Sequence, residues 1–142
     1  MHDTWQRRLT FHGATVILLG LLAGFPYAMV VTGDLVGSER AWRMAHMEGV
    51  TNGLLVLVSA ALWPALRLGD VPRRILAMTL VFTAYANTVA SILGAATNQR
   101  GLAIGGSVAN STVFLLFMIA IVTVFIAVGL LMQGGRQGGE PR

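Results

Sequence analysis

The chain has 142 residues, of which 55% are hydrophobic and 11% are charged. Soluble domains are typically about 45–50% apolar and about 25% charged, so this composition excludes an ordinary soluble protein and indicates an integral membrane protein. The net charge of +4 comes from arginine alone, and the arginines form no cluster on a soluble segment, which argues against a nucleic-acid partner.

Four long apolar stretches predict the architecture. Each is long enough to cross about 30 Å of hydrocarbon as a helix. We expect spans at about 9–31, 39–66, 75–97 and 108–132. The predicted fold class is therefore an all-α integral membrane protein, a four transmembrane helix bundle in a single domain over residues 1–133. The glycine-rich residues 134–142 are expected to form a disordered cytoplasmic tail.

The distribution of arginine predicts the orientation of the bundle. Seven of the ten arginines lie in the N-terminal segment, the second loop and the tail. The positive-inside rule then places both termini in the cytoplasm. The chain has no cysteine, which excludes thiolate metal ligands and covalent attachment of haem.

The first predicted span carries two residues of interest. Pro26 lies inside the apolar stretch, where proline typically bends a helix and frees a backbone carbonyl. His12 lies near the cytoplasmic start of the span. We interpret it as an interfacial hydrogen-bonding residue, with a role as a metal ligand as the alternative.

The second predicted span brings His46 into the membrane. Gly49, Val50 and Gly53 follow at i+3, i+4 and i+7, so the helix surface beside the imidazole is smooth. One interpretation is close helix packing through a small-xxx-small pair. The other is that a flat macrocycle lies on this strip and that His46 ligates its metal.

Further polar and aromatic residues mark the same span. Asn52 lies on a different stripe from His46, so it would serve a neighbouring face or a neighbouring subunit. Glu48 precedes Asn52 by four residues, a spacing that allows the two side chains to bond. Alternatively, Glu48 pairs with an arginine near the outer surface. Trp42 and Trp63, near the two ends, are predicted to be interface anchors.

The third span carries a polar row at successive i+4 steps, and the fourth span is nearly featureless. The row consists of Thr79, Thr83, Asn87 and Ser91, and Tyr85 is its nearest aromatic neighbour. Such side chains commonly form interhelical hydrogen bonds, and the alternative is one wall of a substrate pocket.

The stretch "AWRMAHMEGVTNG", residues 41–53, resembles the second-helix signature of the styrene oxide isomerases, small bacterial membrane enzymes with four helices. The shared pattern is Trp-x-x-x-His-x5-Asn, formed here by Trp42, His46 and Asn52. The resemblance continues in "HG" before the first span, in "LWPALRLGD" at the end of the second, in Asn87, and in "NQRGL" after the third.

The resemblance implies a homotrimer in the bacterial cytoplasmic (inner) membrane, with non-covalent haem b at the subunit interfaces. It implies a ferric iron that acts as a Lewis acid on an epoxide oxygen, and a hydride shift that gives the aldehyde. The axial histidine of the family falls on His46 and its substrate-positioning asparagine on Asn52. Arg100, in "NQRGL", is a further candidate for cofactor binding, and a small apolar substrate would enter from the lipid.

The third span departs from the family pattern. The family places an aspartate and a tyrosine where this chain has Thr83 and Ser91, while Tyr85 sits at a different angle. We therefore treat Asn52, Asn87, Ser91, Thr83 and Tyr85 as the candidate catalytic set. Two alternatives stay open, a haem protein that binds a gas or transfers electrons, and a cofactor-free four-helix transporter.

Overall fold

The computed structural model describes residues 2–136 of the chain, which form four long helices. They are α1 (His2–Thr32), α2 (Glu39–Leu62), α3 (Asp70–Thr97) and α4 (Val108–Arg136), with a short 3₁₀ turn, η1 (Trp63–Ala65), after α2. All four helices are long and apolar enough to cross a membrane. The predicted fold class, an all-helical four-helix membrane bundle, is confirmed.

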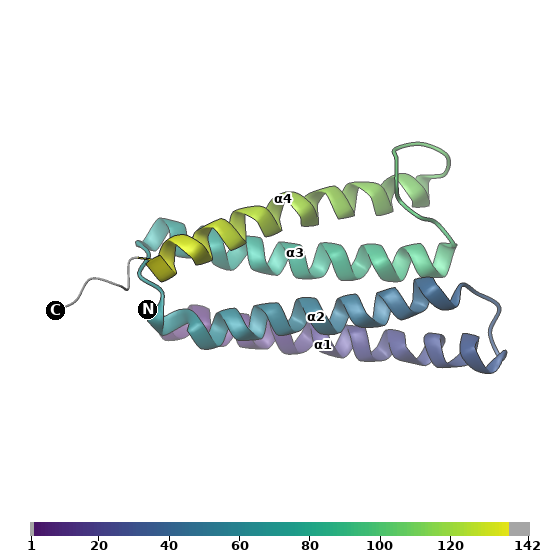
Figure 1. Cartoon of the computed structure of the whole chain (residues 1–142), viewed down its shortest axis with the longest axis horizontal. Helices are drawn as coiled ribbons and strands as arrows, with labels where there is room; N and C mark the ends of the chain where they lie inside the picture. Colours follow the sequence, from purple (N-terminus) through teal and green to yellow (C-terminus); the bar gives the residue numbers. More distant parts are fainter. Residues whose placement is uncertain (1, 137–142) are drawn as a thin grey trace.

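The helices run antiparallel, with α1 packed on α2, α2 on α3 and α3 on α4 (Figure 1). The N-terminus, the turn at residues 63–69 and the end of α4 lie at one end, which we call the proximal end (Figure 1). Loops 33–38 and 98–107 lie at the other, the distal end. Large apolar side chains such as Phe11, Phe25 and Phe125 are exposed on the outside of the bundle, as expected for a surface in lipid.

The helix ends follow from local sequence signals. Ser38 caps α2, its hydroxyl accepting a hydrogen bond from the Ala41 N–H at 3.3 Å. The helix α3 begins at Asp70, five residues earlier than expected, because Pro72 falls in its first turn, where proline costs no hydrogen bond. It ends at Thr97 and is capped by Asn98, which has a left-handed φ of 54°. The helix α4 continues to Arg136, so residues 134–136 of the predicted tail are helical, and residues 137–142 lie outside the described chain.

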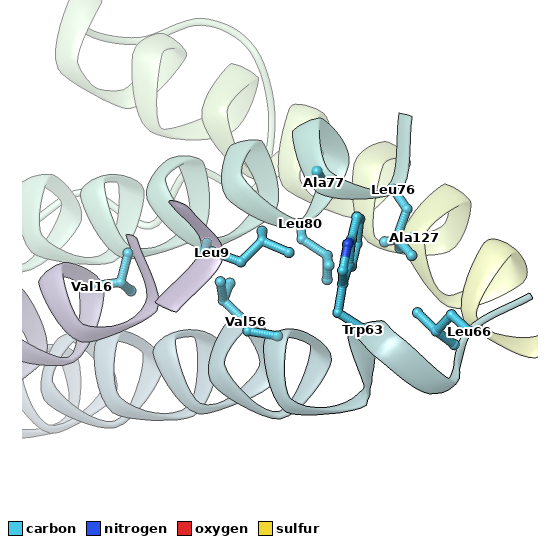
Figure 2. Close-up of a cluster of buried hydrophobic side chains, with 11 residues drawn as sticks. Leu9, Val16, Val56, Trp63, Leu66, Leu76, Ala77, Leu80 and Ala127 are labelled. Atoms are coloured by element: carbon cyan, nitrogen blue, oxygen red, sulfur yellow. The ribbon is translucent and has the colours of Figure 1, made fainter. Parts of the chain in front are cut away.

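The main hydrophobic cluster occupies the proximal half of the bundle (Figure 2). Trp63 lies at its centre with 1% of its surface exposed, between the side chains of Leu66 and Leu80 (Figure 2). The sequence predicted an interface anchor at this position. The structure instead buries the ring in the core, because η1 turns the chain back under the bundle and carries the indole inward.

The first two helices make their closest approach through glycine. A Cβ on Gly49 would lie 2.3 Å from the Gly20 Cα, and a Cβ on Gly53 would lie 2.7 Å from the Gly13 carbonyl oxygen. Real side chains do not fit at these distances, so the two backbones touch. Such small-residue contacts are a main source of helix association in lipid, where the hydrophobic effect between helices is absent.

Candidate functional site

His46 lies on the side of α2 that faces α1, with its imidazole partly buried. Its Nδ1 is 2.9 Å from the Gly20 carbonyl oxygen of α1. A Cβ on Gly24 would lie 3.1 Å from the same nitrogen, so glycine at this position lets the ring rest against α1. Because a carbonyl only accepts, Nδ1 carries the hydrogen, and Nε2 of the neutral ring keeps its lone pair. This tautomer is the one in which Nε2 can ligate a metal.

The smooth strip beside His46 is not open to a cofactor. Gly49 and Gly53 are buried against α1, and the Val50 backbone nitrogen lies 2.6 Å from the place where a Cβ on Gly20 would stand. The suggestion that Gly49 and Gly53 leave room for a macrocycle is therefore corrected in favour of close helix packing, while the Val50 side chain is half-buried. Any ring on His46 has to approach from outside this contact.

On the opposite side of α2, three polar side chains from two helices converge. The Asn52 Nδ2 donates to the Glu48 backbone carbonyl at 2.7 Å and to Glu48 Oε2 at 3.2 Å. The Asn87 Nδ2, from α3, donates to the same carboxylate oxygen. We call Glu48, Asn52 and Asn87 the amide cluster. An intramembrane carboxylate is costly without partners, and these two amides supply them.

The sequence anticipated part of this cluster. The spacing of Glu48 and Asn52 predicted their bond, and the structure confirms it. Pairing of Glu48 with an arginine was the alternative, and the contacts of residues 2–136 include none. The bond to Asn87 was missed because no local spacing links residues on two helices.

A cavity of about 350 Å³ lies at the distal end, between the start of α2, the end of α3 and the loop that follows. Ser91 lines it with 6% of its surface exposed, and its Oγ has no hydrogen-bond partner within the described chain. Arg40 and Arg100 also line the cavity, among mostly small and apolar side chains. Ser91 follows Asn87 by one helical turn, about 6 Å along the axis, so the cavity opens next to the amide cluster.

Arg100 and His46, both predicted to bind the cofactor, do not lie together in the fold of one chain. Arg100 lines the distal cavity, on the α3 side of α2, whereas His46 faces α1 and lines neither that cavity nor the one of about 280 Å³ beside His12. His46 and Glu48 are two residues apart in one helix, about 200° around its axis. Within a single chain, the imidazole and the amide cluster therefore point to opposite sides of α2.

Tyr85 lies in a separate place. Its hydroxyl is 3.1 Å from Nδ1 of His12, in the proximal half of the bundle, and the two rings meet edge to face with centroids 5.7 Å apart. His12 is thus a hydrogen-bonding residue, as the sequence predicted, and its partner on α3 was not predicted. Tyr85 does not reach the amide cluster, and the structure separates it from the other candidate catalytic residues.

Thr83 is buried between α3 and α4. Its Oγ1 is 2.8 Å from the Oγ1 of Thr123 in α4, and the side chain is 3% exposed. This contact occupies the hydroxyl in joining two helices. The Thr83 hydroxyl thus joins α3 to α4.

We expect Thr83→Val to lower stability slightly and to leave activity unchanged. Loss of an interhelical hydrogen bond in a membrane costs about 0.6 kcal/mol. Thr123→Val should cost a similar amount, and the double variant should cost little more than either one, because both remove the same bond. Unfolding of the wild type, the two single variants and the double variant in mixed micelles measures the free energies that this double-mutant cycle compares. If Thr83→Val instead lost turnover roughly tenfold with unchanged stability, Thr83 would have a role in the active site.

The donors for a bare metal ion are sparse. Across residues 2–136, no group of three or more histidine, aspartate or glutamate side chains is placed to hold one. A metal held through His46 alone would need its remaining ligands from elsewhere, as the iron of a porphyrin has. The lone pair on Nε2 suits such a metal.

Comparison with known proteins identifies relatives over almost the whole length. The styrene oxide isomerase family matches residues 5–136. Hydroxylaminobenzene mutase HabB of Ectopseudomonas oleovorans is 31% identical over 125 residues, which cover 85% of this chain and 73% of that protein. Hydroxylaminobenzene mutase HabA of the same organism is 33% identical over 107 residues, which cover 70% of this chain and 73% of that protein.

Proposed function

The chain belongs to the styrene oxide isomerase family, and on this premise we propose that it is a haem b-dependent membrane isomerase that converts an epoxide to a carbonyl compound. In such a rearrangement one C–O bond breaks, a hydride moves to the neighbouring carbon and a C=O bond forms, so no atom is gained or lost. The four spanning helices and the isomerase family support a membrane isomerase. The epoxide and the haem are the proposal.

The observation that carries the proposal is the hydrogen bond from His46 Nδ1 to the Gly20 carbonyl at 2.9 Å. A backbone carbonyl in this position fixes the orientation of the ring, as is usual for histidines that ligate metals. A ferric haem bound there would supply a Lewis acid toward a substrate oxygen. The chain itself holds the ring nitrogen in the right tautomer and orients the substrate through the amide cluster.

The arrangement supports a site shared between subunits. His46 and Asn52 are six residues apart and point about 120° from each other around the axis of α2, so both can act on one substrate only when the second comes from another copy of the chain. We infer a homotrimer with the cofactor between subunits. The apolar surface of the bundle would then admit a small apolar substrate from the surrounding lipid.

A second candidate function is a mutase that acts on an arylhydroxylamine. Both relatives are named for hydroxylaminobenzene, and Thr83, at the position of the family's aspartate, is bonded to Thr123. A mutase moves a group within one molecule. In hydroxylaminobenzene the N–O bond would break and a C–O bond would form on the ring, with a ring proton returning to nitrogen.

The orientation that we propose places the proximal end in the cytoplasm of a bacterial cell, with the protein in the inner membrane. Arg7, Arg67 and Arg73 are among the arginines near that end. The positive-inside rule supports this placement.

The test begins with an absorption spectrum of detergent-purified protein, as isolated and after dithionite, with a pyridine haemochrome assay. We expect a Soret band and haem in a fixed ratio to the chain. Incubation with styrene oxide, and separately with hydroxylaminobenzene, should give a product of unchanged mass from at least one of them.

The remaining outcomes separate the alternatives. Haem without conversion of either compound would favour a gas-binding or electron-transfer protein on this scaffold. A colourless, inactive protein, even when haem is supplied during expression, would contradict the proposal and favour a cofactor-free transporter.

A further inference from the structure

We propose that Glu48 is a positioning residue that turns the side-chain amides of Asn52 and Asn87 so that their carbonyl oxygens, and not their N–H groups, are left for the substrate. The site would therefore select substrates that donate a hydrogen bond. This inference rests on the proposed function, because it assigns the substrate preference of the same site.

The two hydrogens of the Asn52 amide are both engaged. One N–H donates to the Glu48 backbone carbonyl oxygen, 2.7 Å from Nδ2, and the other donates to Glu48 Oε2, 3.2 Å from Nδ2. An amide nitrogen carries two hydrogens, so this group has no donor left. No donor among residues 2–136 bonds to Asn52 Oδ1, which remains free to accept.

Asn87 is held in the same way from the neighbouring helix. Its Nδ2 donates to the Glu48 oxygen that Asn52 also contacts. The oxygen that receives these N–H groups is an acceptor whether or not the carboxyl carries a proton on its other oxygen, so the orientation of both amides does not depend on ionisation. The amide nitrogen is turned toward α2, and Oδ1 is turned away from it.

Within the amide cluster the free acceptors outnumber the free donors, while Ser91, Arg40 and Arg100 bring donors to the neighbouring cavity. Two amide oxygens of the cluster remain unengaged within the described residues, against a single N–H of Asn87. An epoxide oxygen carries no hydrogen and can only accept, so it finds few donors within the amide cluster. An arylhydroxylamine has N–H and O–H groups and can donate to both oxygens. Of the two candidate functions proposed above, the amide cluster thus favours the second, with an arylhydroxylamine as substrate, over the first, with an epoxide.

Sites that hydrogen-bond an OH or NH group reject analogues that lack it, because a buried polar group is then left without a partner. The amide cluster is only partly buried in one chain, so we expect a preference on the order of 100-fold in kcat/KM rather than the larger ratios of enclosed sites. The comparison uses hydroxylaminobenzene and styrene oxide, which are similar in size.

The experiment compares the wild type, Glu48→Gln and Glu48→Leu. Glutamine keeps a carbonyl oxygen at the same distance from the backbone, so the asparagines stay turned and the preference is retained. Leucine removes the carboxylate oxygen and frees the Asn87 amide to rotate, while Asn52 keeps only its bond to the backbone carbonyl of residue 48, so the ratio of the two kcat/KM values should fall at least roughly tenfold. Glu39→Leu, an exposed glutamate of the same helix, is the matched control and should leave the ratio unchanged.

A binding measurement keeps the inference testable without turnover. Phenol donates a hydrogen bond, whereas the ether oxygen of anisole only accepts. Equilibrium dialysis should show that the phenol-to-anisole ratio of bound ligand falls in Glu48→Leu, while Glu48→Gln and Glu39→Leu match the wild type. Comparison between variants cancels partition of the probes into detergent.

The two proposals fail in different ways. An unchanged phenol-to-anisole ratio in Glu48→Leu would overturn the role of Glu48, as would a Glu48→Gln variant that behaves like Glu48→Leu. A wild type without haem and without conversion of either substrate would contradict the proposed function. The dialysis result would still decide whether Glu48 turns the amide oxygens, and not the N–H groups, toward the ligand.

Discussion

Replacement of His46 by alanine is expected to abolish the Soret band of the purified protein and with it the isomerase activity. The Nδ1 of His46 lies 2.9 Å from the Gly20 carbonyl oxygen, which leaves Nε2 as the nitrogen that would bind the iron of the proposed haem. Loss of residues that merely support a metal ligand typically costs 10–100-fold in affinity, and loss of the ligand should exceed this. A haemochrome assay on membranes and on purified protein measures the effect.

The matched control for this variant is His12→Ala. His12 is also a partly buried histidine of the bundle, but it contacts Tyr85 and does not line the amide cluster. It should keep its haem. Added imidazole should restore the Soret band to His46→Gly, because the small ligand fits the space that the side chain vacates. Full haem occupancy in His46→Ala would rule out the ligand assignment.

The second large effect is expected at Gly49. A Cβ there would lie 2.3 Å from the Gly20 Cα, which is backbone and cannot rotate away. Gly49→Ala should lower the free energy of unfolding by about 1–3 kcal/mol, the usual cost of overpacking. Gly49→Leu would force α1 and α2 apart and should leave no folded protein. Unfolding by sodium dodecyl sulfate in mixed micelles, followed by circular dichroism, measures the first variant.

Gly129→Ala is the control that measures the effect of replacing a helical glycine by alanine where no close contact is present. This glycine lies inside α4, and a Cβ on it would meet no heavy atom within 4 Å. Because alanine favours a helix by about 1 kcal/mol over glycine, the substitution should leave stability unchanged or raise it. A Gly49→Ala protein as stable as the Gly129→Ala protein would show that α1 and α2 do not meet as closely as described.

The contrast between Trp63 and Thr83 illustrates the limit of sequence reasoning. Trp63 was predicted to be an interface anchor from its position near the end of a span, and Thr83 was placed in the candidate catalytic set by the resemblance to the family. The structure buries Trp63 because η1 reverses the direction of the chain beneath it, and it pairs Thr83 with Thr123 because α4 returns along α3. Neither the burial of Trp63 nor the contact of Thr83 with Thr123 can be inferred from the neighbouring residues in the sequence.

What the sequence determined by itself was the fold class, the four spans and one local contact. Apolar length alone sets a membrane span, because lipid leaves no other partner for backbone N–H and C=O groups, and the i+4 spacing alone brings Glu48 to Asn52. Only the tertiary structure decided that the Gly49 strip packs on α1 and that Asn87 joins Glu48. These contacts join residues far apart in the chain, and they depend on how two helices cross, which the period of one helix does not specify.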